Sequence, residues 1–264
     1  MAHLRCEFFS DALGLSTSMT VILPQQTTGQ IGMSGQVGDS PPPVLYLLHG
    51  LSDDDTIWLR RTSIERYVAD RGLAVVMPAV HRSFYTDEVY GGQFWTFVSE
   101  ELPALVSGFF RVSDRREDTF VAGLSMGGYG AFKLALRQPE RFAAAASLSG
   151  AVDLARLTGG SGRPADPRMW ERIFGESKKV PADDDLVDLV GRADTATLPA
   201  LWLGCGTADE LYPSNLAFVD ACRSAGVPLE RSFVADAAHE WSLWDAQIAE
   251  VLDWLPLAHP PVAE

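Results

Sequence analysis

Long hydrophobic runs, cysteine and positive charge are scarce in this sequence, and each scarcity excludes a class of protein. No apolar run approaches the roughly 20 residues that a membrane-spanning helix needs, so we expect no membrane partner. The 3 cysteines, Cys6, Cys205 and Cys222, lack the spacing of metal ligands, so we expect free thiols and no bound metal. Lys and Arg number 21 against 35 Asp and Glu, and the formal net charge of -14 argues against nucleic acid as a partner.

The N-terminus lacks the apolar segment of a secretory signal. Residues 1–7 lead within a few positions into a predicted strand, so we expect a cytoplasmic protein. A chain of 264 residues with 47% hydrophobic and 21% charged residues has the size and composition of one globular domain, over 1–264. A homo-oligomer is compatible with the sequence.

Short apolar runs alternate with helical segments along most of the chain, a pattern typical of parallel strands buried on both faces. Residues 4–23 instead predict two antiparallel strands at a sheet edge. The other strands are expected at 44–48, 73–78, 119–123, 143–148, 199–204 and 229–234, and the helices at 56–70, 93–109, 126–137, 213–225 and 241–255. We therefore predict an α/β fold with a mostly parallel central sheet, antiparallel N-terminal edge strands and helices on both faces. The polar stretch at about 151–197 is expected to leave the sheet and to help cover the active site.

One serine lies in a glycine-flanked turn between a predicted strand and a predicted helix. The segment is Gly123-Leu124-Ser125-Met126-Gly127, and this setting makes the G-x-S-x-G pattern indicate a nucleophile elbow. The glycines permit the sharp turn, and the helix N-terminus favours negative charge that develops during attack. The alternative is a glycine-rich turn without chemistry.

A serine hydroxyl needs a general base, and a carboxylate must orient that base. His239 follows the last predicted strand and comes last in chain order, as the hydrolase order of serine, acid and histidine requires. Asp209 follows the strand at 199–204 and is the preferred acid. Asp153 is the competing acid, and Asp236 is expected to cap its own loop.

Acyl transfer also needs two N–H donors for the developing oxyanion. Met126, directly after the serine, supplies the first candidate, and Leu51, in the turn after the strand at 44–48, supplies the second. Gly50 would let the backbone approach a substrate. We expect His49 to stabilise this turn rather than to take part in catalysis.

The sequence resembles the esterase D family, which includes the S-formylglutathione hydrolases, and within it most closely the tributyrin esterase branch. The similarity covers roughly residues 4 to 255 and is carried by the segments Leu47-Leu48-His49-Gly50-Leu51-Ser52, Trp58-Leu59-Arg60-Arg61-Thr62, Ser83-Phe84-Tyr85-Thr86-Asp87, Glu100-Glu101-Leu102-Pro103 and Ala122-Gly123-Leu124-Ser125-Met126-Gly127-Gly128-Tyr129-Gly130-Ala131. The resemblance implies the α/β-hydrolase fold, carboxylesterase activity on short acyl esters and no cofactor. When the family's functional residues are carried over by position, the resemblance assigns the triad and the oxyanion donors to the same five residues that the motifs indicate. They are Ser125, Asp209 and His239 for the triad and Leu51 and Met126 for the oxyanion donors.

Three functions follow as hypotheses. The first is a carboxylesterase that acts on a small-molecule ester, and the second is S-formylglutathione hydrolysis. Formylglutathione hydrolases usually show Thr-Cys after His-Gly-Leu, whereas Ser52 and Asp53 stand there in this chain, which favours simple esters. The third, more distant hypothesis is a non-catalytic binding protein on a hydrolase scaffold.

Aromatic residues in glycine-punctuated loops are candidates for binding the acyl or aryl group. They are Tyr85, Trp95 and Trp170, together with Trp241 beside the predicted base. The alternative is that these rings only pack the loops.

Overall fold

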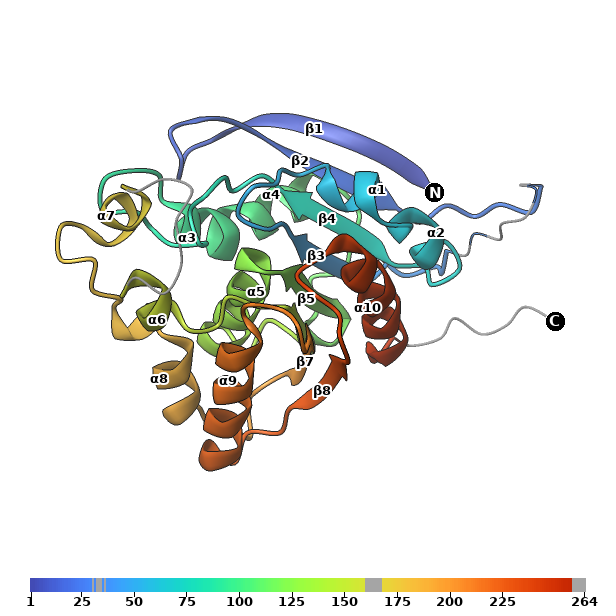
Figure 1. The fold of residues 1–264 in the computed structure, drawn as a ribbon. Helices are drawn as coiled ribbons and strands as arrows, with labels where there is room; N and C mark the ends of the chain where they lie inside the picture. The colour runs from blue at the N-terminus through green and yellow to red at the C-terminus, as the bar shows by residue number, and fades with distance from the viewer. Residues whose placement is uncertain (30, 32–34, 36, 160–167, 258–264) are drawn as a thin grey trace.

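The computed structural model describes residues 1–29, 31, 35, 37–159 and 168–257, and a single eight-stranded sheet runs through it (Figure 1). The strand order is β1-β2-β4-β3-β5-β6-β7-β8. The strands are β1 (Ala2–Ser10), β2 (Leu15–Leu23), β3 (Val44–Leu48), β4 (Ala74–Pro78), β5 (Thr119–Leu124), β6 (Ala144–Leu148), β7 (Ala200–Gly206) and β8 (Glu230–Val234). The pairs β1–β2 and β2–β4 are antiparallel and all others are parallel, so the predicted sheet is confirmed.

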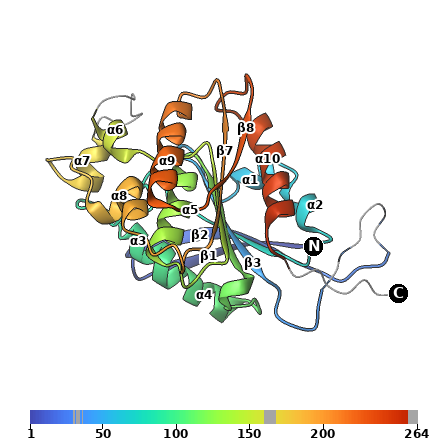
Figure 2. The ribbon, with the colours of Figure 1, turned by 90° about the horizontal axis from the view of Figure 1, so that it is seen from below.

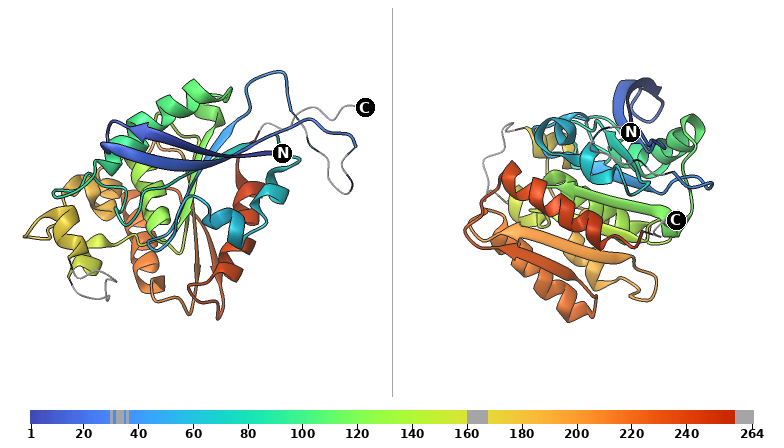
Figure 3. Two further views of the ribbon diagram at one scale, coloured as in Figure 1. Left: turned by 90° about the horizontal axis from the view of Figure 1, so that it is seen from above. Right: turned by 90° about the vertical axis from the view of Figure 1, so that its right-hand side faces the viewer.

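Burial explains why the positions of these strands could be predicted from the sequence. Every residue of β3, β4, β5 and β6 is buried, as expected for parallel strands covered on both faces. In β1 the exposed and partly buried residues alternate, which fits an edge strand with one solvated face. Figure 3 shows the β1–β2 hairpin at one end of the sheet and β7 and β8 at the other.

Helices cover both faces of the sheet (Figure 2). One apolar cluster joins a sheet face to α4, α5, α8 and α9, and the second joins the opposite face to α1, α2 and α10. The helices are α1 (Ile57–Arg61), α2 (Ile64–Val68), α3 (Phe94–Thr96), the π-helical η1 (Phe97–Glu101), α4 (Leu102–Phe109), the 3-10 turn η2 (Arg116–Asp118), α5 (Met126–Arg137), α6 (Leu154–Thr158), α7 (Met169–Phe174), the 3-10 turn η3 (Ala182–Asp184), α8 (Leu186–Gly191), α9 (Tyr212–Ala225) and α10 (Trp241–Trp254).

Two predicted helices differ from the structure. The segment at 56–70 forms two short helices because the chain becomes extended at Thr62, whose hydroxyl bonds back to the Trp58 carbonyl at 2.6 Å. The segment at 93–109 is interrupted by the π-helical turn η1.

The stretch at 151–197 lies between β6 and β7, and its described part forms α6, α7, η3 and α8. Residues 160–167 of this stretch lie outside the described residues. Helix α7 bonds to the loop after β4, because Val89 N–H donates to the Ile173 carbonyl at 3.0 Å and Tyr90 N–H to the Arg172 carbonyl at 2.9 Å. The excursion therefore lies against the loop that follows β4.

Candidate active site

Ser125 stands at the junction of β5 and α5 with a left-handed backbone, φ 53° and ψ -116°. A non-glycine residue in this region of conformational space is strained, and such strain is typical of a functional turn. The turn is held by hydrogen bonds from Ser125 N–H to the Leu148 carbonyl at 2.9 Å and from Tyr129 N–H to the Ser125 carbonyl at 3.1 Å. The serine is only partly buried.

The flanking glycines are required by close backbone contacts. A β-carbon on Gly123 would lie 2.4 Å from the Gly127 carbonyl oxygen, and one on Gly127 would lie 2.4 Å from the Leu48 carbonyl oxygen. Both distances are far below van der Waals contact with backbone that cannot move aside. The tight turn therefore needs glycine at both positions.

Asp209 and His239 meet beyond the carboxyl ends of β7 and β8. The Asp209 side chain is fully buried, and its Oδ2 lies 2.8 Å from Nδ1 of His239, whose side chain is 28% exposed. The second oxygen, Oδ1, accepts the Leu211 N–H at 2.8 Å. Burial raises the pKa of Asp209, but the hydrogen bonds from His239 and Leu211 outweigh it and the net pKa is lowered. The carboxylate is thus stabilised in its charged form beside the imidazole.

The segment after β6 connects the serine turn to this pair. Ala151 N–H donates to the Ser125 carbonyl at 3.0 Å, and Ser149 N–H donates to the Gly204 carbonyl at 2.7 Å. The Ser149 hydroxyl accepts Trp244 Nε1–H at 3.1 Å, and the Trp244 ring lies edge-on to the His239 ring with centroids 4.7 Å apart. Backbone and side-chain contacts therefore hold the serine turn and the imidazole against the same segment.

Asp153 and Asp236 make other contacts. The Asp153 carboxylate caps helix α6 by accepting the Arg156 N–H at 2.9 Å. Asp236 is exposed, and its N–H donates to the Thr207 hydroxyl at 2.9 Å. Of the three candidate carboxylates, Asp209 alone bonds to His239 within the described residues.

The turn after β3 is bound from several directions. His49 is buried, its Nδ1 lies 2.7 Å from the Gly50 carbonyl, and its Nε2 accepts the Val80 N–H at 3.0 Å. Burial lowers the pKa of His49 to about 4, so the ring is neutral with its proton on Nδ1. Tyr85 donates its hydroxyl to the His49 carbonyl at 2.9 Å. The expectation that His49 is structural is confirmed.

This turn passes close to the serine. A β-carbon placed on Gly50 would lie 2.9 Å from Asp53 Oδ2 and 3.8 Å from Ser125 Cβ. The Asp53 carboxylate and Ser125 Cβ are therefore within about 7 Å of each other. Leu51, the predicted second oxyanion donor, directly follows Gly50 in this turn.

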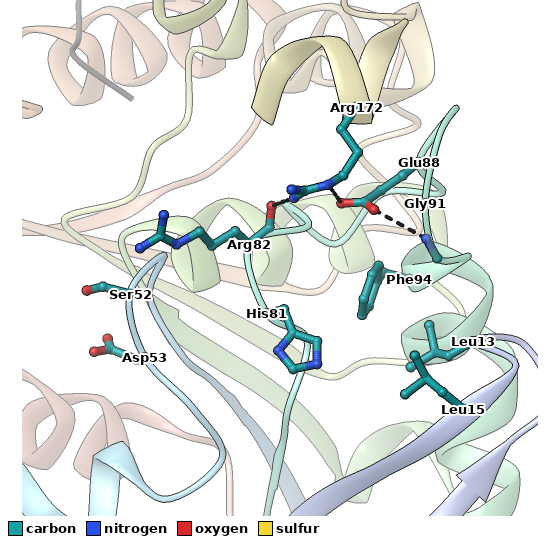
Figure 4. A pocket seen from close by; sticks show the side chains of 11 residues that line it. Leu13, Leu15, Ser52, Asp53, His81, Arg82, Glu88, Gly91, Phe94 and Arg172 are labelled. Carbon is teal, nitrogen blue, oxygen red and sulfur yellow. Dashed lines mark hydrogen bonds and ion pairs between the residues drawn. The ribbon is translucent and has the colours of Figure 1, made fainter. Parts of the chain in front are cut away.

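A pocket of about 630 Å³ opens next to the turn (Figure 4). Ser52 and Asp53 are among its lining residues, and Ser125 is not. The lining residues come from the β1–β2 hairpin, the turn after β3, the loop after β4 and helix α7, and they are Leu13, Leu15, Ser52, Asp53, His81, Arg82, Glu88, Gly91, Gly92, Phe94 and Arg172.

None of the four aromatic residues predicted to bind substrate lines this pocket. Tyr85 is 0% exposed, and Trp170 is 6% exposed and packs against Phe84, so neither ring reaches a ligand in the pocket. The Trp95 ring lies under the guanidinium of Arg137 at 4.0 Å. Trp241 packs edge-on against Trp58 and Trp244. The alternative interpretation, rings that pack the loops, holds for Tyr85 and Trp170.

The sequence points to the loop after β4 through its aromatic residues, but the residues of this loop that line the pocket are His81, Arg82, Glu88, Gly91, Gly92 and Phe94. His81, Phe84 and Tyr85 all have positive φ, between 49° and 52°. Three strained non-glycine residues so close together persist only when the surroundings hold them. Arg172 is part of that support, since its Nη2 donates to the Arg82 carbonyl and its Nε to Glu88, each at 3.0 Å. No local sequence pattern predicts the positive φ angles of these three residues.

The sheet order and the strained serine turn define an α/β-hydrolase of the serine hydrolase class. A family model described as "Putative esterase" matches residues 10–255, and the chain belongs to that family. The resemblance to the esterase D family is thereby confirmed.

Individual relatives agree with this assignment. FphF, a fluorophosphonate-binding serine hydrolase of Staphylococcus aureus, is 33% identical with a TM-score of 0.85, over 96% of this chain and 98% of that one. An S-formylglutathione hydrolase (FrmB) of the same organism is 33% identical with a TM-score of 0.83, over the same shares. An acetyl esterase of Caldicellulosiruptor saccharolyticus is 27% identical over 97% of this chain and 98% of its own length. The chain is a serine esterase, a carboxylic ester hydrolase.

Proposed function

We propose that the enzyme hydrolyses short-chain acyl esters through a triad of Ser125, His239 and Asp209. The observation that carries the proposal is the 2.8 Å contact between His239 and the buried Asp209, at the sheet edge that also holds the strained Ser125. An imidazole held in this way keeps its proton on Nδ1 and donates it to the carboxylate as a hydrogen bond, which leaves Nε2 free to act as a base. The acetyl esterase relative supports a short acyl group.

In the first half of the reaction the Ser125 hydroxyl attacks the ester carbonyl and gives its proton to His239 Nε2. The carbonyl oxygen becomes an oxyanion, for which Leu51 and Met126 supply N–H groups. Met126 is the first residue of α5, where the N–H has no acceptor within the helix. Collapse of the intermediate breaks the bond to the alcohol, which leaves with the proton from His239, and an acyl-enzyme remains.

In the second half a water molecule attacks the acyl-enzyme and gives its proton to His239. The second tetrahedral intermediate releases the carboxylic acid, and the Ser125 hydroxyl is restored. Asp209 stays ionised throughout and stabilises the imidazolium that forms in each half. These residues carry out the chemistry without a cofactor or metal, as the family resemblance implies.

Replacing Ser125 by alanine tests the proposal. We expect Ser125→Ala to remove p-nitrophenyl acetate hydrolysis and labelling by a fluorophosphonate probe, with the circular dichroism spectrum unchanged. Ser224→Ala, at an exposed position on α9, is the matched control and should keep both activities. Full turnover by Ser125→Ala would refute the assignment.

The second candidate function is S-formylglutathione hydrolysis. It is favoured by the 33% identity to the Staphylococcus aureus S-formylglutathione hydrolase. The presence of Ser52 and Asp53 after Leu51 favours simple esters instead. A kcat/KM for S-formylglutathione more than tenfold above that for p-nitrophenyl acetate would reverse the order of the two candidates.

We further propose that the chain forms one domain that works in the cytoplasm. Its three cysteines are free in the structure, which suits a reducing compartment. Among the described residues no helix has the length and apolarity to cross a bilayer.

A further inference from the structure

We infer that Asp53 determines specificity by the charge of the alcohol part of the ester: it admits cationic and neutral alcohols and rejects alcohols that carry a carboxylate. This inference rests on the proposed function, because it places the ester beside Ser125. Its support is the position of the carboxylate, the absence of a Lys or Arg nitrogen within 4.0 Å of it among the described residues, and the size of the pocket.

Asp53 lies in the turn after β3, close to the serine. Its Oδ2 lies against Gly50, within about 7 Å of Ser125 Cβ. Burial is the main cause that raises the pKa of Tyr85, and the negative charge of Asp53 raises it further. The carboxylate of Asp53 is therefore near Ser125 and also lines the pocket.

Asp53 differs from the two acidic residues that follow it because it has no counter-ion. Asp54 pairs with Arg60 at 3.2 Å, and Asp55 lies 3.6 Å from Arg5 and accepts the Ser18 and Thr20 hydroxyls. Within the described part of the chain no Lys or Arg nitrogen lies within 4.0 Å of Asp53. Burial, the largest effect, raises the pKa of this half-buried carboxyl, and the hydrogen bond from Gly50 and the charges of Arg60 and Arg61 offset it only in part.

The other charges of the pocket are arranged differently. Glu88 and Arg172 bond to each other at 3.0 Å, so they neutralise one another. The side chain of Arg82 extends towards the side of the pocket where Ser52 and Asp53 lie, as Figure 4 shows, and among the described residues it makes no ion pair with Asp53. Arg82 is the group that would favour an anionic alcohol, and the experiment must separate it from Asp53.

The volume of the pocket assigns it to the alcohol. A space of about 630 Å³ is far larger than an acetyl or butyryl group fills, and a short acyl chain is what the proposed function places on Ser125. An alcohol that leaves Ser125 towards the pocket passes the Asp53 carboxylate. Two unit charges about 7 Å apart at an effective dielectric near 20 change an equilibrium constant roughly 50-fold, and solvent screening reduces this to about tenfold.

Three acetate esters test the inference: acetylcholine with a cationic alcohol, its neutral isostere 3,3-dimethylbutyl acetate, and 4-acetoxybutanoate with an anionic alcohol. We expect kcat/KM to decrease in that order for the wild-type enzyme. Asp53→Asn, which keeps an oxygen acceptor for Gly50, should reduce the ratio of the cationic to the anionic ester by about tenfold or more. Raising the salt to 0.5 M should compress the wild-type ratio without any substitution.

Asp54→Asn is the matched control, because it removes a neighbouring charge that does not line the pocket. An unchanged ratio in Asp53→Asn would overturn the inference, as would a wild-type preference for the anionic ester that Arg82→Gln abolishes. Asp53→Ser serves if Asp53→Asn does not fold. Failure of the proposed function is distinguishable, since it would show as p-nitrophenyl acetate turnover that survives Ser125→Ala.

Discussion

The charge on Asp209 is stabilised by hydrogen bonds that a neutral amide would not accept in the same way. An asparagine there could turn its amino group towards His239 and hold the imidazole with its proton on the wrong nitrogen. We expect Asp209→Asn to lower kcat for p-nitrophenyl acetate by about 10³ to 10⁴-fold with little change in KM, measured by steady-state kinetics.

Asp153→Asn is the comparison for that experiment. Its carboxylate caps α6 and makes no contact with His239 among the described residues, so kcat should stay within a few-fold of wild type. The reverse pattern, activity lost in Asp153→Asn and kept in Asp209→Asn, would exchange their roles.

His49 couples the stability of the protein to pH. Its pKa is lowered from 6.5 to about 4 by burial, so between these pH values the unfolded chain binds a proton that the folded chain does not. Stability is therefore lost as the pH falls from 6.5 to 4. We expect the free energy of unfolding of wild type to lose about 2 kcal/mol more than that of His49→Gln between pH 7 and pH 4.5, measured by urea denaturation. A stability gap that stays constant with pH would contradict this, and exposed His81→Gln is the control.

At the scale of elements, the contact between α5 and β3 depends on one missing side chain. A methyl group on Gly127 would meet the Leu48 carbonyl at 2.4 Å and the His49 carbonyl at 2.8 Å, both part of the backbone. We expect Gly127→Ala to destabilise the protein by about 3 kcal/mol or more, as thermal unfolding would show.

Gly108→Ala is the matched substitution for that measurement. Gly108 lies exposed in α4, and a β-carbon there would have no neighbour within 4 Å. The change should be neutral or should stabilise the protein by up to about 1 kcal/mol, because alanine favours the helix. Equal destabilisation by both substitutions would mean that helix propensity, not the contact with β3, sets the cost.

The elements differ in how far the sequence reveals them. Strands such as β5 are continuous apolar runs because both faces are covered, so their positions follow from composition alone. The serine turn was predictable from its place between a strand and a helix, and the proposed acid and base were chosen because the chemistry requires fixed positions after particular strands. The break at Thr62 was not, because it depends on one side chain that bonds back to the preceding turn.

The pocket was the part least accessible to sequence reasoning. Leu13 and Phe94 both line it although they lie far apart in the chain. The loop between His81 and Tyr85 adopts its strained form only through tertiary contacts. The sequence therefore suggested that bulky aromatic residues near the site bind the substrate. In the structure Tyr85 and Trp170 are buried and pack within these loops.

At the scale of the whole molecule, Lys133 joins parts that the sheet does not connect directly. Its fully buried ammonium, on α5, bonds to the Tyr85 carbonyl at 2.9 Å, to the Thr86 hydroxyl at 2.8 Å and to Asp184 of the excursion. Removing one partner of a buried ion pair leaves the other charge uncompensated. We expect Lys133→Met to lower the free energy of unfolding by about 3 kcal/mol, measured by chemical denaturation.

The double variant with Asp184→Asn should recover part of this loss, because the carboxylate is then absent as well. If the loss in the free energy of unfolding of the double variant equals the sum of the losses of the two single variants, the two groups act independently.

The edge-on contact of His239 with Trp244 also makes the active site visible to spectroscopy. An indole that touches a protonated imidazole loses fluorescence, and the rings of Trp58, Trp241 and Trp244 form a row that ends at His239. In the proposed mechanism each turnover places a proton on that imidazole twice. The native emission of this row should therefore dim and recover with the protonation of His239, so that catalysis can be followed with light and without a chromogenic ester.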